Sequence, residues 1–268
     1  MNTHGSVWRG DERLSVWALN QTNTALRDDA ATRSAEALLR SAGLPTHPDR
    51  TKNWDTFLAL YHAMTHVEPF EAILDAGAER YSAFLPALSR CGYRDLTAIN
   101  LTFGAPQKAD GITFRNGDIT RTGMASQSYA FIACLSVIEH GVDIAAFLQE
   151  SARLLVPGGR LFLSFDYWEE PVDTRGQHAY GVPIRIFTRR DIDEMLGWAA
   201  KAGLSIEGAA DFSCKGPGRA LAALRPSLHI REFAAPQRVR SAAVGILTIL
   251  VSHDALTRGD LPARLQDG

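Results

Sequence analysis

Two kinds of hydrophobic pattern alternate along most of the chain. Short apolar runs predict buried strands at 72–74, 96–101, 112–114, 129–135, 160–165, 204–212 and 244–251. Between them, the spacing of apolar residues predicts helices at 82–91, 142–155 and 188–202, the last opened by a capping box at Thr188 and Asp191. Because strand and helix alternate, we predict an α/β fold: a doubly wound, mostly parallel sheet with helices on both faces.

The N-terminal part follows a different pattern. Residues 1–50 predict polar coil followed by one helix at 31–42, which Gly43 and Pro45 stop. A second helix is predicted at 54–64, where apolar residues recur at intervals of three and four. We therefore divide the chain into an N-terminal extension with a helix, 1–50, and an α/β domain, 51–268. The extension is expected to close over the binding cleft, and an irregular excursion, 212–243, to precede the last strand.

Composition and charge narrow the class of protein. The chain has 268 residues, 46% of them hydrophobic, and a net charge of −2, so it can bury a core but has no general electrostatic attraction for nucleic acid. Three widely spaced cysteines form no pair typical of a disulfide framework or a zinc site, and no metal is expected. The longest apolar run, 242–251, is half the roughly 20 residues of a membrane-spanning helix. We expect a cytoplasmic protein, with its oligomeric state left open.

Polar residues follow the ends of five predicted strands. In an open parallel sheet, ligands bind beyond the carboxyl ends of the strands, where the strand order reverses. The residues at these ends are Asp75, Gly77, Glu79, Asn100, Asp118, Ser136, Val137, Glu139, His140, Asp166, Tyr167 and Trp168. We expect them to line one cleft.

Four stretches carry a resemblance to a known family. They are Leu74-Asp75-Ala76-Gly77-Ala78, Thr97-Ala98-Ile99-Asn100-Leu101, Cys134-Leu135-Ser136-Val137-Ile138-Glu139-His140 and Leu154-Leu155-Val156-Pro157-Gly158-Gly159-Arg160-Leu161. In this order and spacing, they resemble the motifs of class I S-adenosylmethionine-dependent methyltransferases, of the small-molecule type, over about 73–167. The resemblance implies a Rossmann-like fold, S-adenosylmethionine as cofactor with S-adenosylhomocysteine as product, and methyl transfer to a small-molecule acceptor. O- or N-methylation is the expected reaction.

The resemblance also implies which residues bind the cofactor. They are Asp75, Gly77, Glu79, Asn100, Leu101, Asp118, Ile119, Ser136 and Val137. Gly77 would let the backbone approach the cofactor, and Asp75 would organise the site around its amino group. The end of the second strand would hold the ribose. Asp118 and Ile119 would edge the adenine, and the two residues after the fourth strand would run beneath the methionine chain.

Three positions depart from the family pattern. Glu79 and Tyr81 stand where the family has its second and third glycines, and Asn100 stands where it has an acid. Asn100 can still hydrogen-bond to a ribose, without the stronger bonds of a carboxylate. Glu79 could supply the missing charge, block the site, or only complement the dipole of the following helix.

The acceptor side leaves several interpretations open. His140 is the candidate general base, because histidine titrates near neutrality, but a helix cap or a supporting hydrogen bond would fit it equally well. The segment 166–187 is either the acceptor loop or a surface loop; its candidate substrate-binding residues are Tyr167, Trp168, Glu169, His178 and Tyr180. Trp54 either covers the cofactor or packs in the core. His62 and His66, one helical turn apart, lack a third metal ligand and favour a solvated helix face.

Two other functions compete with methyl transfer. The three departures from the motif would also suit a catalytically silent methyltransferase-like protein that acts as a binding partner or scaffold. A nicotinamide-dependent dehydrogenase is the weaker alternative, because no GxGxxG motif follows the first strand.

Overall fold

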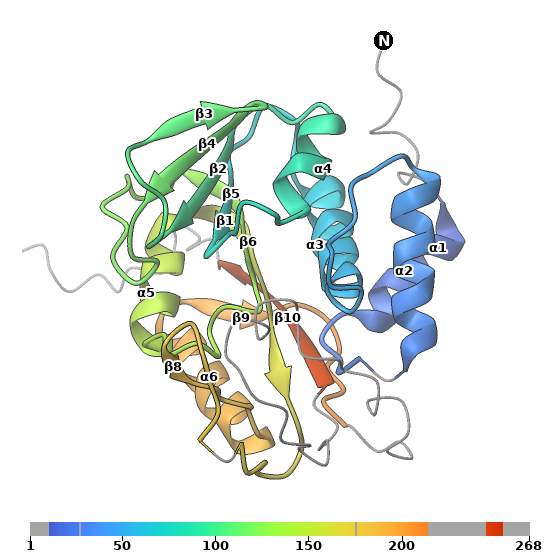
Figure 1. Cartoon of the computed structure of the whole chain (residues 1–268), viewed down its shortest axis with the longest axis vertical. Helices are drawn as coiled ribbons and strands as arrows, with labels where there is room; N and C mark the ends of the chain where they lie inside the picture. Colours follow the sequence, from blue (N-terminus) through green and yellow to red (C-terminus); the bar gives the residue numbers. More distant parts are fainter. Residues whose placement is uncertain (1–10, 27, 175, 214–244, 254–268) are drawn as a thin grey trace, which may run out of the picture.

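The computed structural model describes residues 11–26, 28–174, 176–213 and 245–253. Its centre is an eight-stranded sheet in the order β3-β4-β2-β1-β5-β6-β10-β9 (Figure 1). The five strands from β4 to β6 are mutually parallel, while β10 runs antiparallel to both β6 and β9, and β3 runs antiparallel to β4. The predicted α/β fold with a mostly parallel sheet is confirmed.

The predicted strands and helices occur in the predicted order. The strands are β1 (Ile73–Ala76), β2 (Leu96–Asn100), β3 (Gln107–Ala109), β4 (Ile112–Asn116), β5 (Tyr129–Leu135), β6 (Leu155–Tyr167), β7 (His178–Ala179), β8 (Val182–Pro183), β9 (Leu204–Ile206) and β10 (Gly245–His253). The helices are α1 (Glu12–Gln21), α2 (Asp29–Ser41), α3 (Lys52–His66), α4 (Phe84–Arg90), α5 (Ile144–Leu154) and α6 (Arg189–Lys201).

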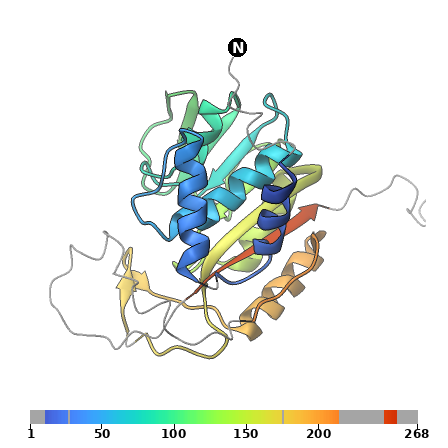
Figure 2. The ribbon, with the colours of Figure 1, turned by 90° about the vertical axis from the view of Figure 1, so that its right-hand side faces the viewer.

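Helices cover both faces of the sheet and divide the core in two. On one face α3 and α4 pack on the strands, and α1 and α2 lie outside α3 (Figure 2). On the other face α5 and α6 pack on β6 and β9 around a second apolar cluster. The helix α3 is the most deeply placed, because every residue from Asn53 to Met64 is buried. It is a central element of the fold, and it anchors the two helices of the N-terminal extension.

The N-terminal extension contains one helix more than predicted. Asp11 caps α1 by accepting hydrogen bonds from Arg13 N and Leu14 N, at 3.0 and 3.1 Å. After α1, the buried side chain of Asn23 accepts a hydrogen bond from Leu250 N at 2.7 Å and donates one to Glu207 O at 2.7 Å. The extension is thereby tied to β10 and to the chain just beyond β9, in addition to packing on α3.

Three local predictions need correction. The strand predicted at 160–165 is longer: β6 begins at Leu155 and includes Pro157, Gly158 and Gly159, where the pairing with β5 shifts register and Gly158 adopts a φ of +80°. The strand predicted at 204–212 ends at Ile206. The short antiparallel pieces β3, β7 and β8 were not predicted, since none is an apolar run.

Two predicted elements have the expected local structure. The capping box of α6 is present: Thr188 N donates to Asp191 Oδ2 at 2.7 Å, and Asp191 N donates to Thr188 Oγ1 at 3.4 Å. The last predicted strand is β10. The excursion predicted at 212–243 lies outside the described residues except for its first two. The proposed division at residue 50 stays a prediction.

Candidate active site

The strand order reverses between β1 and β5, and a close backbone contact marks this point. Gly77, directly after β1, has a φ of +86°, and its N–H donates to Ile99 O at 2.8 Å. A Cβ atom on Gly77 would lie 2.5 Å from Cγ1 of Val137, the second residue after β5. Only glycine fits both the backbone angle and the space. The residues predicted to flank the cofactor are therefore adjacent in space.

The loop after β1 is held by the end of β2. Asn100 Nδ2 donates to Gly77 O at 3.3 Å and to Ala78 O at 3.0 Å, and it lies 3.5 Å from Glu79 Oε1. Asn100 Oδ1 accepts from the backbone and hydroxyl of Thr102. The side chain of Asn100 thus shapes the loop, and the nearest carboxylate at this end of the cleft belongs to Glu79.

The residues predicted around the adenine and ribose occupy varied environments. Leu101 is 71% exposed, whereas Ile119 is buried in the core cluster on the α5 face. Asp118 accepts hydrogen bonds from the backbone and hydroxyl of Thr120, at 2.8 and 2.7 Å. Asp118 therefore stabilises its own turn, and the side chain of Ile119 faces the core.

A lysine from α3 reaches the end of β5. Ser136, whose φ is +54°, accepts a hydrogen bond from Lys52 Nζ through its hydroxyl group. Ser136 N in turn donates to Ser164 O at 2.8 Å, which fixes this turn against β6. Sequence reasoning placed Ser136 in the site but missed Lys52, because a residue at a helix start carries no strand-end signal.

Four carboxyl groups lie around this lysine and the neighbouring strand ends. Burial raises the pKa of Asp55 to about 6, although Lys52 and a 2.6 Å hydrogen bond from Ser164 Oγ oppose the shift. Burial, together with Asp55, raises the pKa of Asp75 to about 7. Burial raises the pKa of Glu139 and of Asp166, and the Asp166 charge adds to the rise at Glu139. Near neutral pH the group can both bind a cation and release protons.

Glu139 stands out within this group. It is only 1% exposed, and its Oε2 atom has no hydrogen-bond partner. A buried carboxylate oxygen without a partner is costly, so this position favours a ligand that brings positive charge or a donor. Burial lowers the pKa of Lys52, but Asp166, Asp55 and Glu139 outweigh it and raise this pKa.

Aromatic side chains from three segments meet beside His140. The His140 and Tyr180 rings are 4.8 Å apart in an edge contact, the Tyr81 and Tyr180 hydroxyls are 3.4 Å apart, and the His47 ring is 5.4 Å from that of Tyr81. Burial, followed by the charge of Lys52, lowers the pKa of His140 to about 4, so its imidazole is neutral near pH 7. Its Nδ1 atom is buried without a partner.

The segment after β6 separates the predicted substrate-binding residues. Tyr167 is fully buried in the core and donates its hydroxyl to Phe212 O at 2.8 Å, which corrects its placement in an acceptor pocket. Trp168 and Glu169 are half-buried, and His178 is exposed on β7. Only Tyr180 contacts the candidate base. The hairpin of β7 and β8 covers the turn after β5, since Val182 packs against Gly141.

The open interpretations of Trp54, His62 and His66 can now be decided. Trp54 is fully buried in the core, and its indole N–H donates to Gln21 Oε1 at 3.3 Å. His62 is buried too, with Nε2 at 2.7 Å from Thr22 Oγ1, so the solvated face expected for it is wrong. Within the described ranges, no three or more His, Cys, Asp or Glu side chains are grouped to hold a metal ion.

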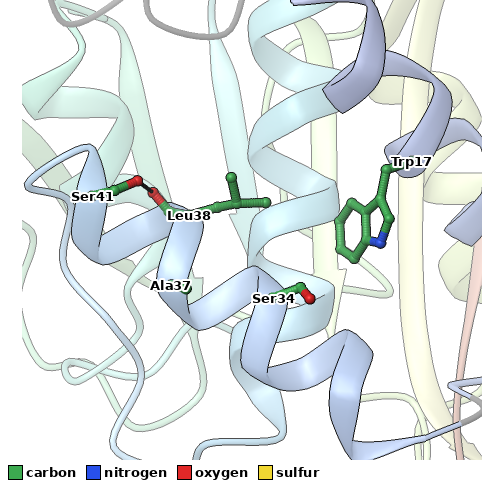
Figure 3. A pocket seen from close by; sticks show the side chains of 5 residues that line it. All are labelled: Trp17, Ser34, Ala37, Leu38 and Ser41. Atoms are coloured by element: carbon green, nitrogen blue, oxygen red, sulfur yellow. Dashed lines mark hydrogen bonds between the residues drawn. The ribbon is translucent and has the colours of Figure 1, made fainter.

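A surface groove lies elsewhere, between α1 and α2. It is lined by Trp17, Ser34, Ala37, Leu38 and Ser41, with none of the strand-end residues among them (Figure 3). In the extension, α1 and α2 lie outside α3 (Figure 2), and the His47 ring lies beside Tyr81; the predicted closure over the cleft stays a prediction. Of the part of the chain that is described, no helix has the length and apolar character to cross a bilayer.

Comparisons with known proteins agree with this geometry. Residues 74–163, about a third of the chain, match the family model described as "Methyltransferase domain". A Galdieria sulphuraria protein with the provisional name sarcosine dimethylglycine methyltransferase has a similar structure: the TM-score is 0.53 at 18% identity, covering 91% of this chain and 98% of that one. The [4+2]-cyclase SpnF gives a TM-score of 0.51 at 12% identity, covering 85% and 94%.

A third similar structure is much longer than this chain. It is phosphoethanolamine N-methyltransferase 2 of Haemonchus contortus in complex with S-adenosylmethionine, with a TM-score of 0.45 at 16% identity. The match covers 57% of this chain but only 38% of that protein. No curated protein matches the chain. The two structures with TM-scores above 0.5 show the fold alone, while the family match is to a methyltransferase domain and covers 74–163.

Proposed function

We propose that this chain, which contains a class I methyltransferase domain, transfers the methyl group of S-adenosylmethionine to the oxygen or nitrogen of a small-molecule acceptor. The observation that supports this most directly is the contact between Gly77 and Val137. It brings the glycine turn after β1 against the end of β5, at the reversal of strand order and inside the matched domain. Ligands of open α/β sheets bind at this position.

The side chains of the site fit a ligand of positive charge. S-adenosylmethionine carries a sulfonium and an ammonium group against one carboxylate. Around its place the chain offers the buried carboxyl groups of Asp75 and Glu139, the latter with an oxygen that lacks a partner. The Glu79 carboxylate, 3.5 Å from Asn100 Nδ2, lies where ribose hydroxyls would be bound. Each of these groups is an acceptor or an anion, as such a ligand requires.

The residues beside His140 provide the acceptor side. When bound, S-adenosylmethionine supplies a methyl group that is already activated by the sulfonium, so the protein mainly has to align the acceptor with it. His140 Nδ1, neutral and without a partner, takes the proton that an O–H or N–H acceptor loses. The Tyr180 ring packs against His140 and limits water at this atom.

Binding of the cofactor is the first test. Isothermal titration with S-adenosylmethionine and with S-adenosylhomocysteine should give one site per chain, and both ligands should raise the melting temperature. Asp75→Asn keeps the shape of the side chain but removes its charge, and should weaken binding of S-adenosylmethionine. The matched control is Asp173→Asn, an exposed carboxylate of the segment after β6. Absence of heat and of a thermal shift with both ligands would rule out the proposed function.

A catalytically silent binding protein is the second candidate. It is favoured by Tyr81, which stands in a glycine position of the family motif and contacts Tyr180 across the cleft. Mass spectrometry of the purified protein separates the two: copurified cofactor supports the enzyme, whereas a stable protein partner without cofactor supports the scaffold.

A further inference from the structure

Lys52 is a charged residue of the site to which the proposed function has given no role yet. It is the first residue of α3, and its ammonium group donates to the hydroxyl of Ser136 at the end of β5. Ser136 is the position expected beneath the methionine chain of the cofactor. Two arginines of the neighbouring loops are engaged elsewhere: Arg185 pairs with Asp191 at 2.7 Å, and Arg80 lies over the rings of Phe103 and Phe114.

Lys52 lies among carboxyl groups, because the charges of Asp166, Asp55 and Glu139 all act on it and raise its pKa. Asp55, one turn further along α3, is held by Ser164 Oγ and by Thr56 N, at 2.6 and 2.8 Å. Glu139 keeps one oxygen without a partner. The site therefore places an ammonium group close to a buried carboxyl group, which carries a negative charge once it is deprotonated. A zwitterion matches such a pair, because each of its charges then meets the opposite one.

We propose that Lys52 binds the carboxylate of the amino-acid end of S-adenosylmethionine, while the neighbouring carboxylates of Glu139 and Asp166 take its ammonium group. The proposal rests on the proposed function, since it assigns a residue to the same cofactor. Ser136, now the partner of Lys52, is left to bond to the ligand or to water. Lys52 thereby makes α3, which lies before the matched domain, part of the cofactor site.

The test compares two ligands that differ only at the amino-acid end. S-adenosylhomocysteine has the ammonium and carboxylate groups, whereas 5′-methylthioadenosine lacks both. Their dissociation constants are measured by isothermal titration for the wild type, for Lys52→Met and for the control Lys108→Met, an exposed lysine of β3. We expect Lys52→Met to weaken the binding of S-adenosylhomocysteine roughly 10- to 100-fold, the effect of losing a hydrogen bond between charged groups. Binding of 5′-methylthioadenosine should change less than about twofold in either variant, within the scatter of surface substitutions.

A labelling experiment on the wild type keeps the proposal testable if Lys52→Met does not fold. Reaction of Lys52 with an amine-specific reagent, quantified by mass spectrometry against Lys108, should be suppressed by S-adenosylhomocysteine and not by 5′-methylthioadenosine. The proposal would be overturned if Lys52→Met lost affinity for both ligands equally, or if it bound S-adenosylhomocysteine more tightly than the wild type. The latter would mean that Lys52 is an internal counter-ion which the cofactor displaces. If the wild type binds neither ligand, the proposed function itself fails.

Discussion

Gly77→Ala tests the close backbone approach on which the proposed cofactor site depends. The substitution adds a Cβ atom 2.5 and 2.6 Å from the two methyl carbons of Val137, at a backbone φ of +86°. The left-handed backbone costs an L-residue about 1–2 kcal/mol. Forcing an extra methyl group into a packed contact costs about 1–3 kcal/mol more. We therefore expect Gly77→Ala to lower the free energy of unfolding by about 2–5 kcal/mol.

A double-mutant cycle separates the two contributions. Val137→Ala removes the two methyl carbons nearest to the new Cβ atom and leaves only the Cβ atom of residue 137, at 3.1 Å, so it relieves most of the packing cost and leaves the backbone cost unchanged. The double variant should be more stable than the sum of the single effects by about 1–3 kcal/mol. The matched control is Gly104→Ala, where a Cβ atom meets nothing within 4 Å; it should change stability by less than about 0.5 kcal/mol.

Urea denaturation measures the stabilities, and titration with S-adenosylhomocysteine measures the site. The single variant should lose affinity, and the double variant should regain part of it. Additive effects of Gly77→Ala and Val137→Ala would refute the contact. So would a Gly77→Ala variant as stable as Gly104→Ala.

The remaining predictions concern buried polar groups. Asn23→Ala should lower the free energy of unfolding by about 2–4 kcal/mol in urea denaturation, because it leaves the buried Leu250 N and the partly buried Glu207 O without their partner. The exposed control Asn116→Ala should lower it by less than about 1 kcal/mol. The raised pKa values of Asp55 (about 6) and Asp75 (about 7) contribute to the free energy of unfolding in full below pH 4, and this contribution is lost as the pH rises through 6–7. Because the cationic S-adenosylmethionine favours the deprotonated carboxylates, it should bind more tightly at pH 8 than at pH 6 and should release protons when it binds. Calorimetry in buffers of different ionisation enthalpy detects this release. Burial, followed by the charges of His66 and Arg160, lowers the pKa of His62 to about 3. The stability that neutral His62 contributes is therefore present in full above pH 6.5 and is lost as the pH falls towards 3. His62→Leu should reduce the fall of the melting temperature at acid pH, and an unchanged fall would exclude His62 as its cause.

The sequence predicted the central strands well because they are buried on both faces. The run at 129–135 coincides with β5, and the predicted order of strands and helices is that of the structure. Apolar periodicity fails where burial is slight. The helix α1 exposes Val16 and Leu19, and β3 is wholly exposed, so neither carries a hydrophobic pattern. For α1 the capping residue Asp11 was the available signal.

The site was predictable only as far as strand ends define it. That rule selected Gly77, Ser136, Glu139 and His140, which the structure brings together or links through Lys52. It could not select Lys52, because this residue lies on a helix, α3. That helix is held in place by the packing of its almost wholly buried side chains and not by its position at a strand end. It also placed Tyr167 in the cleft, although alternation along β6 turns this side chain into the core.

The two departures from the family pattern, Glu79 and Asn100, are neighbours in the structure. An aspartate at 100 would carry no N–H group, and so would be unable to donate to the carbonyl groups of Gly77 and Ala78 as Asn100 does. The amide at this position thus stabilises the turn whose later glycines are missing. The Glu79 carboxylate lies beside this amide, with its Oε1 atom 3.5 Å from Asn100 Nδ2. Under the proposed function, Glu79 would supply from the loop the negative charge that the family pattern has at the end of the second strand, and binding of S-adenosylhomocysteine to Glu79→Gln would test this role.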